Sequence, residues 1–98
     1  MATRTRKPTH PGAILREDIL PELGMSQAEL ARRLGVSRLT VSELIHEKRA
    51  LSPDMAMRLA RLLNTTPESW LGMQQALALW ELQNERGAEY QKIGSVAA

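Results

Sequence analysis

One group of side chains, spread over residues 27–49, has the chemistry needed to recognise a nucleic acid. Arg38 can donate two hydrogen bonds to a guanine edge, and Leu39 can pack on a thymine methyl group. Hydroxyl groups can contact bases or phosphates, and basic side chains suit phosphate contacts, which position a protein without reading sequence. The candidate DNA-binding residues are Gln27, Ser37, Arg38, Leu39, Thr40, Ser42, Glu43, His46, Lys48 and Arg49.

Five of these residues would form a stripe on one face of a helix, namely Arg38, Leu39, Ser42, Glu43 and His46. The last four lie one, four, five and eight residues after Arg38, which places all five side chains on one side of the helix. The opposite side carries Val41, Leu44 and Ile45, which we expect to be buried. Glu43 fits two roles, because its carboxylate could accept from cytosine or hold a neighbouring basic side chain. Since polar stripes also occur on merely solvated helices, the stripe does not identify which residues read bases.

Two short helices separated by a sharp turn are predicted to position this stripe. The first begins at Ser26, with Glu29 three residues later as in a reciprocal capping box, and Gly35 closes it. The second begins at Ser37. Ala31 lies where the helices would cross, and a larger side chain there would push them apart. This pattern predicts a helix-turn-helix unit, which presents its second helix to the major groove of DNA.

Three further helices and no strand are predicted around this unit. One begins near Pro11, buries Leu15 and Ile19, and ends near residues 21–24. The other two begin with Ser-Pro-Asp and Thr-Pro-Glu, which are typical helix starts. The fold class is therefore all-α with five helices. We expect a flexible basic arm at 1–8, a helix-turn-helix domain at 9–87 whose C-terminal helix spans 66–86, and a tail at 88–98.

Composition argues against catalysis. The 98 residues are 43% hydrophobic but only 3% aromatic, which suits one aliphatic core. The absence of cysteine excludes disulfides, thiolate metal sites and cysteine nucleophiles. His10 and His46 lack companions at ligand spacing, and no glycine-rich phosphate loop or nucleophilic arrangement is recognisable. We therefore expect no enzyme activity, no metal site and no cofactor.

The net charge of +2 is distributed unevenly along the chain. Residues 1–63 carry eleven lysines or arginines against seven acids, whereas residues 64–98 carry two against four. The excess in the first part fits a nucleic-acid surface. No apolar run approaches ~20 residues and no signal-peptide core is present, so we expect a cytoplasmic protein with no membrane contact.

The segment SQAELARRLGVSRLTVSELIHEKRALSPDMAMRLARLLNTTPESWLGMQ resembles the five-helix domain of the lambda-repressor and Cro type, also called Xre-like. Three shorter stretches, HPGAILRED at 10–18, KRALSPDMAMRLARLL and TPESWLGMQ, together resemble HigA-type antitoxins. The resemblance covers about residues 9 to 80. It implies a lambda-repressor-like fold and two roles. One is binding a small, ribosome-dependent, mRNA-cutting toxin of the RelE-like fold, and the other is repression of the protein's own operon at its operator.

The C-terminal helix independently predicts a second subunit. It is apolar on two faces, and a helix with two apolar faces needs two apolar neighbours. One face carries Leu71, Ala78 and Leu82. The other face, predicted to form a homodimer interface, carries Trp70, Met73, Leu77 and Trp80. A two-fold dimer would hold two recognition helices about 34 Å apart and would require an inverted-repeat operator.

The same sequence features also fit other interpretations. Both apolar faces could be absorbed by the chain's own core, or one could bind a toxin instead of a second copy. Within DNA binding, the alternative is a phage-type repressor without a toxin. Outside DNA binding, the alternative is a protein-interaction module that keeps the fold but no longer binds DNA.

Overall fold

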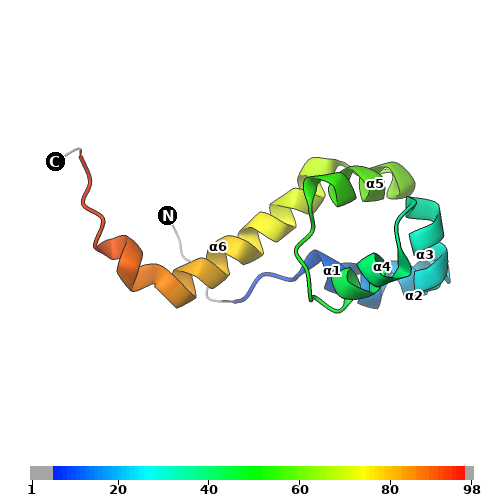
Figure 1. Cartoon of the computed structure of the whole chain (residues 1–98), viewed down its shortest axis with the longest axis horizontal. Helices are drawn as coiled ribbons and strands as arrows, with labels where there is room; N and C mark the ends of the chain where they lie inside the picture. The colour runs from blue at the N-terminus through cyan, green and yellow to red at the C-terminus, as the bar shows by residue number, and fades with distance from the viewer. Residues whose placement is uncertain (1–5, 97–98) are drawn as a thin grey trace.

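The structure is a computed structural model that describes residues 6–96, and in that range it contains helices and no strand (Figure 1). The elements in chain order are α1 (Pro11–Ile14), η1 (Leu15–Ile19), α2 (Leu20–Leu23), α3 (Gln27–Leu34), α4 (Arg38–Ile45), α5 (Pro53–Leu63) and α6 (Pro67–Gln91). Because α1, η1 and α2 follow one another without a break, they form one first helix, and the described part of the chain has five helices. The predicted all-α fold is confirmed.

The first helix contains a wide turn, η1, that the sequence did not predict. The Leu20 N–H donates to the carbonyl of Leu15, five residues back, as in a π-helix. Pro21 follows at once, and in a regular α-helix its ring would collide with the Glu17 carbonyl. The extra residue in this turn shifts the position that faces the core by one residue, from Ile19 to Leu20. Leu20 is therefore buried, whereas Ile19, which was predicted to be buried, is only half-buried.

The other helices begin at the predicted capping residues. Each cap is a hydroxyl side chain that accepts a hydrogen bond from the backbone N–H three residues later, an interaction worth ~1 kcal/mol. The four caps are Ser26, Ser37, Ser52 and Thr66. At the first of them, the Glu29 carboxylate contacts Arg32 and Arg33. The serine half of the predicted capping box is thus present, while the glutamate is directed into helix-surface ion pairs.

An aliphatic core joins all five helices, as the composition predicted. The most deeply buried side chains include Leu15, Leu30, Val41, Leu44 and Leu59. The first helix crosses α4 at very short distance, because a Cβ placed on Gly12 would lie 1.9 Å from the Leu44 carbonyl oxygen. Only glycine allows this approach.

His10 caps the first helix and ties it to the segment after α4. Its Nδ1 accepts from the Gly12 N–H at 2.9 Å, and its Nε2 lies 3.1 Å from the Arg49 carbonyl oxygen. Since a carbonyl can only accept, Nε2 must donate, and the buried ring is the neutral Nε2–H tautomer. This histidine therefore acts in the structure as a helix cap.

α6 is the longest helix, and its C-terminal half extends away from the other helices (Figure 1). The predicted helix 66–86 ended at Gly87, but the helix continues to Gln91 with a local break at Arg86, where φ is −129° and ψ is 15°. Gly87 does not adopt the left-handed conformation that usually ends a helix. Arg86 also contacts Glu89 at 3.4 Å, which supports the final turn. The tail therefore begins after Gln91 and not at residue 88.

The chain ends are only partly described. Residues 1–5 of the predicted arm and residues 97 and 98 of the predicted tail lie outside the described range. Lys7 Nζ lies 3.8 Å from Glu81 Oε2 on α6, so the described end of the arm runs beside that helix. Between residues 6 and 96, no helix is both long enough and apolar enough to cross a membrane.

Candidate nucleic-acid interface

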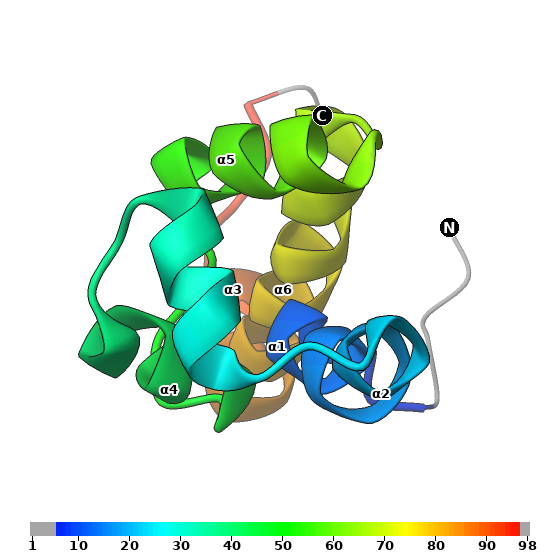
Figure 2. The same ribbon diagram turned by 90° about the vertical axis from the view of Figure 1, so that its right-hand side faces the viewer.

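The turn between α3 and α4 has the conformation that the sequence predicted. Gly35 is left-handed, with φ 72° and ψ 34°, and the Val36 N–H donates to the Ala31 carbonyl at 3.0 Å. Ala31 is buried, as expected for the small residue at a helix crossing. α3 lies between α4 on one side and α5 on the other (Figure 2). This geometry holds α4 at the surface of the molecule.

Arg58, on α5, fixes the beginning of this turn. Its guanidinium donates to the Leu34 carbonyl at 2.8 Å and its Nε donates to Asp54 at 2.8 Å. The last carbonyls of a helix lack partners within the helix, so a donor here stabilises the end of α3. The sequence did not predict this role for Arg58. The four-residue spacing from Asp54 could have suggested the local ion pair, but no local pattern marks a bond to a residue 24 positions away.

Arg16, on the first helix, fixes the other end of α4. Its guanidinium donates to the Ile45 carbonyl and lies 3.3 Å from the Glu47 carboxylate. Glu47 is left-handed, with φ 62°, and follows directly after the end of α4. The sequence gave no signal for this contact either, because it joins residues 29 to 31 positions apart. α5 thus holds the turn that leads into α4, and the first helix holds the end of α4.

The predicted stripe on α4 lies on the surface of the chain. Val41, Leu44 and Ile45 are buried on the opposite side, as predicted. Arg38 is exposed, and Leu39, the next residue, is 68% exposed. An exposed arginine beside an exposed leucine offers a hydrogen-bond donor and an apolar surface to one partner. Those are the two groups that can contact guanine and thymine in a major groove.

The rest of the stripe is partly engaged within the chain. Glu43 lies 3.2 Å from Arg49, so its carboxylate holds a neighbouring basic side chain, one of the two roles considered for it. The His46 Nδ1 donates to the Ser42 carbonyl at 2.8 Å, which leaves Nε2 directed away from that bond. Ser42 and Glu43 are half-buried, whereas His46 is exposed. These side chains line one surface but differ in how free they are to contact DNA.

The remaining candidates surround the stripe. Gln27 is exposed in the first turn of α3, and Lys48 and Arg49 are exposed after α4. Ser37 Oγ accepts from the Thr40 N–H at 3.0 Å and lies 2.8 Å from its hydroxyl, so both side chains take part in the helix cap. Among residues 6–96, no group of three or more His, Asp or Glu side chains could hold a metal ion.

The apolar face of α6 that was predicted to form a dimer is mainly directed into the chain's own core. Trp70 and Leu77 are buried, and the Trp70 indole N–H donates to the Thr65 hydroxyl at 2.8 Å. Met73 and Trp80 are half-buried. Apolar side chains also remain exposed elsewhere on α6, with Leu79 67% exposed. A second subunit can reach Met73, Trp80 and Leu79 but not the two core residues.

Comparison with known proteins places this geometry among DNA-binding proteins. A family model described as Helix-turn-helix matches residues 15–71. The chain is 46% identical to the uncharacterized HTH-type transcriptional regulator YbaQ of Escherichia coli K12, covering 86% of this chain and 74% of that protein. It is 38% identical to antitoxin HigA-1 of Vibrio cholerae, covering 86% and 79%. The solved structure of antitoxin GraA in complex with its operator is 40% identical, with a TM-score of 0.89 over 100% of both chains.

Proposed function

We propose that this chain, which belongs to the HigA-type antitoxins of the Xre-like helix-turn-helix family, represses transcription by inserting α4 into the major groove of operator DNA. The observation that carries the proposal is the pair Arg38 and Leu39. Both are exposed at the start of a helix that is preceded by a turn bonded to Arg58 and is held at its end by Arg16. A rigidly held reading surface loses little conformational entropy on binding.

In this mechanism the contacts divide into two kinds. Arg38 reads guanine and Leu39 packs on a thymine methyl, while Lys48 contacts phosphate and sets the register of the protein on the duplex. Gln27 lies at the start of α3, where it can approach the DNA backbone or a base edge. Glu43 keeps Arg49 in place for a phosphate contact. Because the target is genomic DNA, the proposal also places the protein in the cytoplasm.

The operator complex would contain a homodimer. Two copies of α4 separated by about 34 Å can read adjacent major grooves of an inverted repeat. In the proposed interface, a second subunit contacts Met73 and Trp80, which are the two half-buried residues of the predicted face of α6. Leu79 adds exposed apolar surface on the same helix. Trp70 and Leu77 would support this surface from the core.

The second half of the proposal is toxin neutralisation. An antitoxin of this type would bind a small mRNA-cleaving toxin of the RelE-like fold and mask its active surface. The support is the family membership and the 38% identity to a protein named antitoxin HigA-1. Coexpression of the chain with the toxin-sized protein encoded beside it should restore growth and yield a stable complex on purification. A neighbouring protein that is harmless alone and does not copurify would contradict this half.

The DNA-binding half is tested by footprinting on the region upstream of the gene. The wild type should protect two half-sites one helical turn apart, and its affinity should fall steeply with salt, because phosphate contacts release counterions. Arg38→Ala should weaken binding by ~1 to 3 kcal/mol and relax the preference at one base position. Arg86→Ala, which removes an arginine far from α4, is the matched control. Equal footprints and affinities for all three proteins would contradict the proposal.

A further inference from the structure

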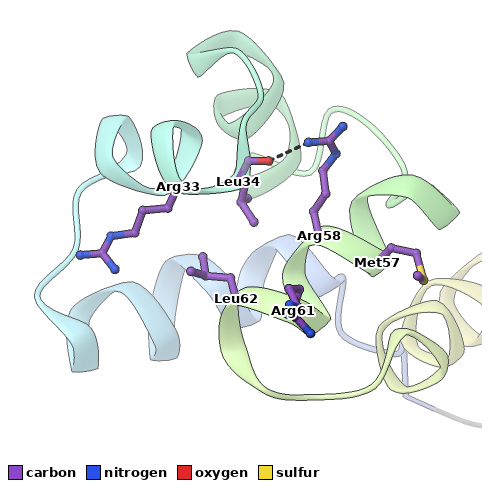
Figure 3. Close-up of a pocket in the computed structure, with 6 residues that line it drawn as sticks. All are labelled: Arg33, Leu34, Met57, Arg58, Arg61 and Leu62. Carbon is purple, nitrogen blue, oxygen red and sulfur yellow. Dashed lines mark hydrogen bonds between the residues drawn. The ribbon is translucent and has the colours of Figure 1, made fainter.

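A second basic surface lies between α3 and α5, beside the helix-turn-helix turn. It is a pocket of about 500 Å³ whose walls combine guanidinium groups with apolar side chains (Figure 3). The lining residues are Arg33, Leu34, Met57, Arg58, Arg61 and Leu62. A second hollow of about 560 Å³ shares Met57 and Arg61 and continues along α5 to Pro67. Together the two hollows, hereafter the α3–α5 groove, follow the outer side of α5.

The α3–α5 groove is separate from the surface proposed to read DNA. α3 lies between α5 and the recognition helix α4, so it separates the groove from α4 (Figure 2). None of the groove-lining residues belongs to the α4 stripe. Of the arginines that line it, Arg58 serves the turn before α4, but repression through α4 gives no reason for Arg61.

The positive charge of the groove is only partly neutralised. Arg33 pairs with Glu29 at 3.2 Å and Arg58 pairs with Asp54 at 2.8 Å. Arg61 is exposed, and no carboxylate among residues 6–96 pairs with it. A planar guanidinium can bind a carboxylate through two parallel hydrogen bonds. The groove thus offers at least one free site for an acidic side chain.

The apolar part of the groove points to a protein and not to a phosphate backbone. Met57 is 62% exposed between the two hollows, and Leu62 is half-buried beside it. Exposed methionine is an adaptable contact that binding surfaces use to fit apolar side chains. The charged phosphates of a DNA backbone would leave this apolar surface unfilled. A helix with leucines on one side and glutamates along the edges matches both parts of the groove.

We propose that the α3–α5 groove binds an acidic amphipathic helix of a partner protein, with a carboxylate on Arg61 and its apolar face on Met57 and Leu62. A second copy of this chain is the competing occupant, because its α6 carries Glu81, Glu85 and Glu89, and the oligomeric state tests for it. The inference goes beyond operator repression and does not depend on it.

The test uses the full chain and a synthetic, fluorescently labelled helical peptide of about four turns, with leucines on one face and glutamates along its edges. The matched peptide has lysine in place of each glutamate. Fluorescence anisotropy should show binding of the acidic peptide at least about tenfold tighter than of the basic one. In ¹⁵N-labelled protein, its amide shifts should fall on residues 33–34 and 57–62. Equal affinity for both peptides, or shifts centred on residues 38–46, would overturn the proposal.

Two substitutions locate the binding energy. Arg61→Glu should weaken the acidic peptide by at least about tenfold, and Met57→Ala should weaken it by about threefold. Both side chains are exposed, so neither change should unfold the chain. Arg86→Glu makes the same charge change on α6 and should leave the peptide affinity within about twofold. Equal losses for Arg61→Glu and Arg86→Glu would show nonspecific attraction and overturn the proposal.

Two further readouts exclude the other occupants. If light scattering shows that Arg61→Glu converts a dimer to a monomer, a second copy occupies the groove. If Arg61→Glu lowers operator affinity and its salt dependence more than Arg86→Glu does, DNA phosphates occupy it. Either result contradicts the proposal. Unchanged oligomeric state and operator binding, together with lost peptide binding, support it, and operator binding by Arg38→Ala reports separately on the proposed repressor function.

Discussion

The α3–α4 unit and α6 show two ways in which a short sequence positions a helix. α4 is eight residues long, yet it is capped by Ser37, supported by Arg58 at the turn and tied by Arg16 at its end. α6 is 25 residues long but buries only Trp70 and Leu77, and it has a local break at Arg86. The short helix is therefore determined within the chain, whereas the long one leaves Leu79, Leu82 and Tyr90 exposed.

The largest effect is expected from a substitution at the close crossing between the first helix and α4. In Gly12→Ala, the new methyl group would lie 1.9 Å from the Leu44 carbonyl oxygen, so the first helix must move away from α4. We expect a loss of ~3 kcal/mol or more in the free energy of unfolding, because a backbone atom cannot move aside as a side chain can. Urea denaturation measures this loss. A stability equal to wild type would mean that the two helices do not cross so closely.

A smaller effect should follow from removing the support at the turn. Arg58→Ala leaves the Leu34 carbonyl without its donor and removes the ion pair with Asp54. Since the side chain is partly exposed, we expect ~1 kcal/mol of lost stability, together with faster amide hydrogen exchange in residues 34–38. Arg61→Ala, on the same helix, should change stability by less than ~0.5 kcal/mol. Equal losses in the two variants would contradict a specific role for Arg58.

The parts of the fold that the sequence predicts depend on contacts between neighbouring residues, whereas the parts that it does not predict depend on contacts between residues far apart in the chain. Caps at Ser26, Ser37, Ser52 and Thr66 and the left-handed Gly35 depend on neighbouring residues, so the local sequence identifies them. The bonds of Arg16 and Arg58 join residues more than 20 positions apart, and no periodicity marks them. The π-turn before Pro21 shifted the core register by one residue. The sequence also identified an apolar face on α6 but could not show that Trp70 and Leu77 point into the core.

Two leucines with nearly equal exposure can distinguish the proposed roles of α4 and α6. Leu39 on α4 is 68% exposed and Leu79 on α6 is 67% exposed. Leu39→Ala should weaken operator binding by ~1 kcal/mol without changing the oligomeric state, because it removes contact with a thymine methyl. Leu79→Ala should weaken the dimer by a similar amount. Anisotropy and sedimentation measure the two effects, and the reverse assignment would refute the separate roles of these helices.

The smallest expected effect has the opposite sign. Gly72 lies in the exposed part of α6, and a Cβ built there meets no atom within 4 Å. Gly72→Ala should therefore raise the free energy of unfolding by ~0.5 to 1 kcal/mol through helix propensity and reduced freedom of the unfolded chain. The same denaturation experiment compares it with Gly12→Ala. A loss of stability here would indicate that this side of α6 is covered by a second subunit.

The most direct test of the central claim is methylation interference at guanine N7, an atom exposed in the major groove. With wild type, N7 methylation of one guanine in each half-site should block binding, because Arg38 donates to that edge. With Arg38→Ala, methylation of the same guanine should no longer matter, while ethylation of the contacted phosphates should still interfere with binding. An identical interference pattern for the two proteins would show that the start of α4 does not read the major groove.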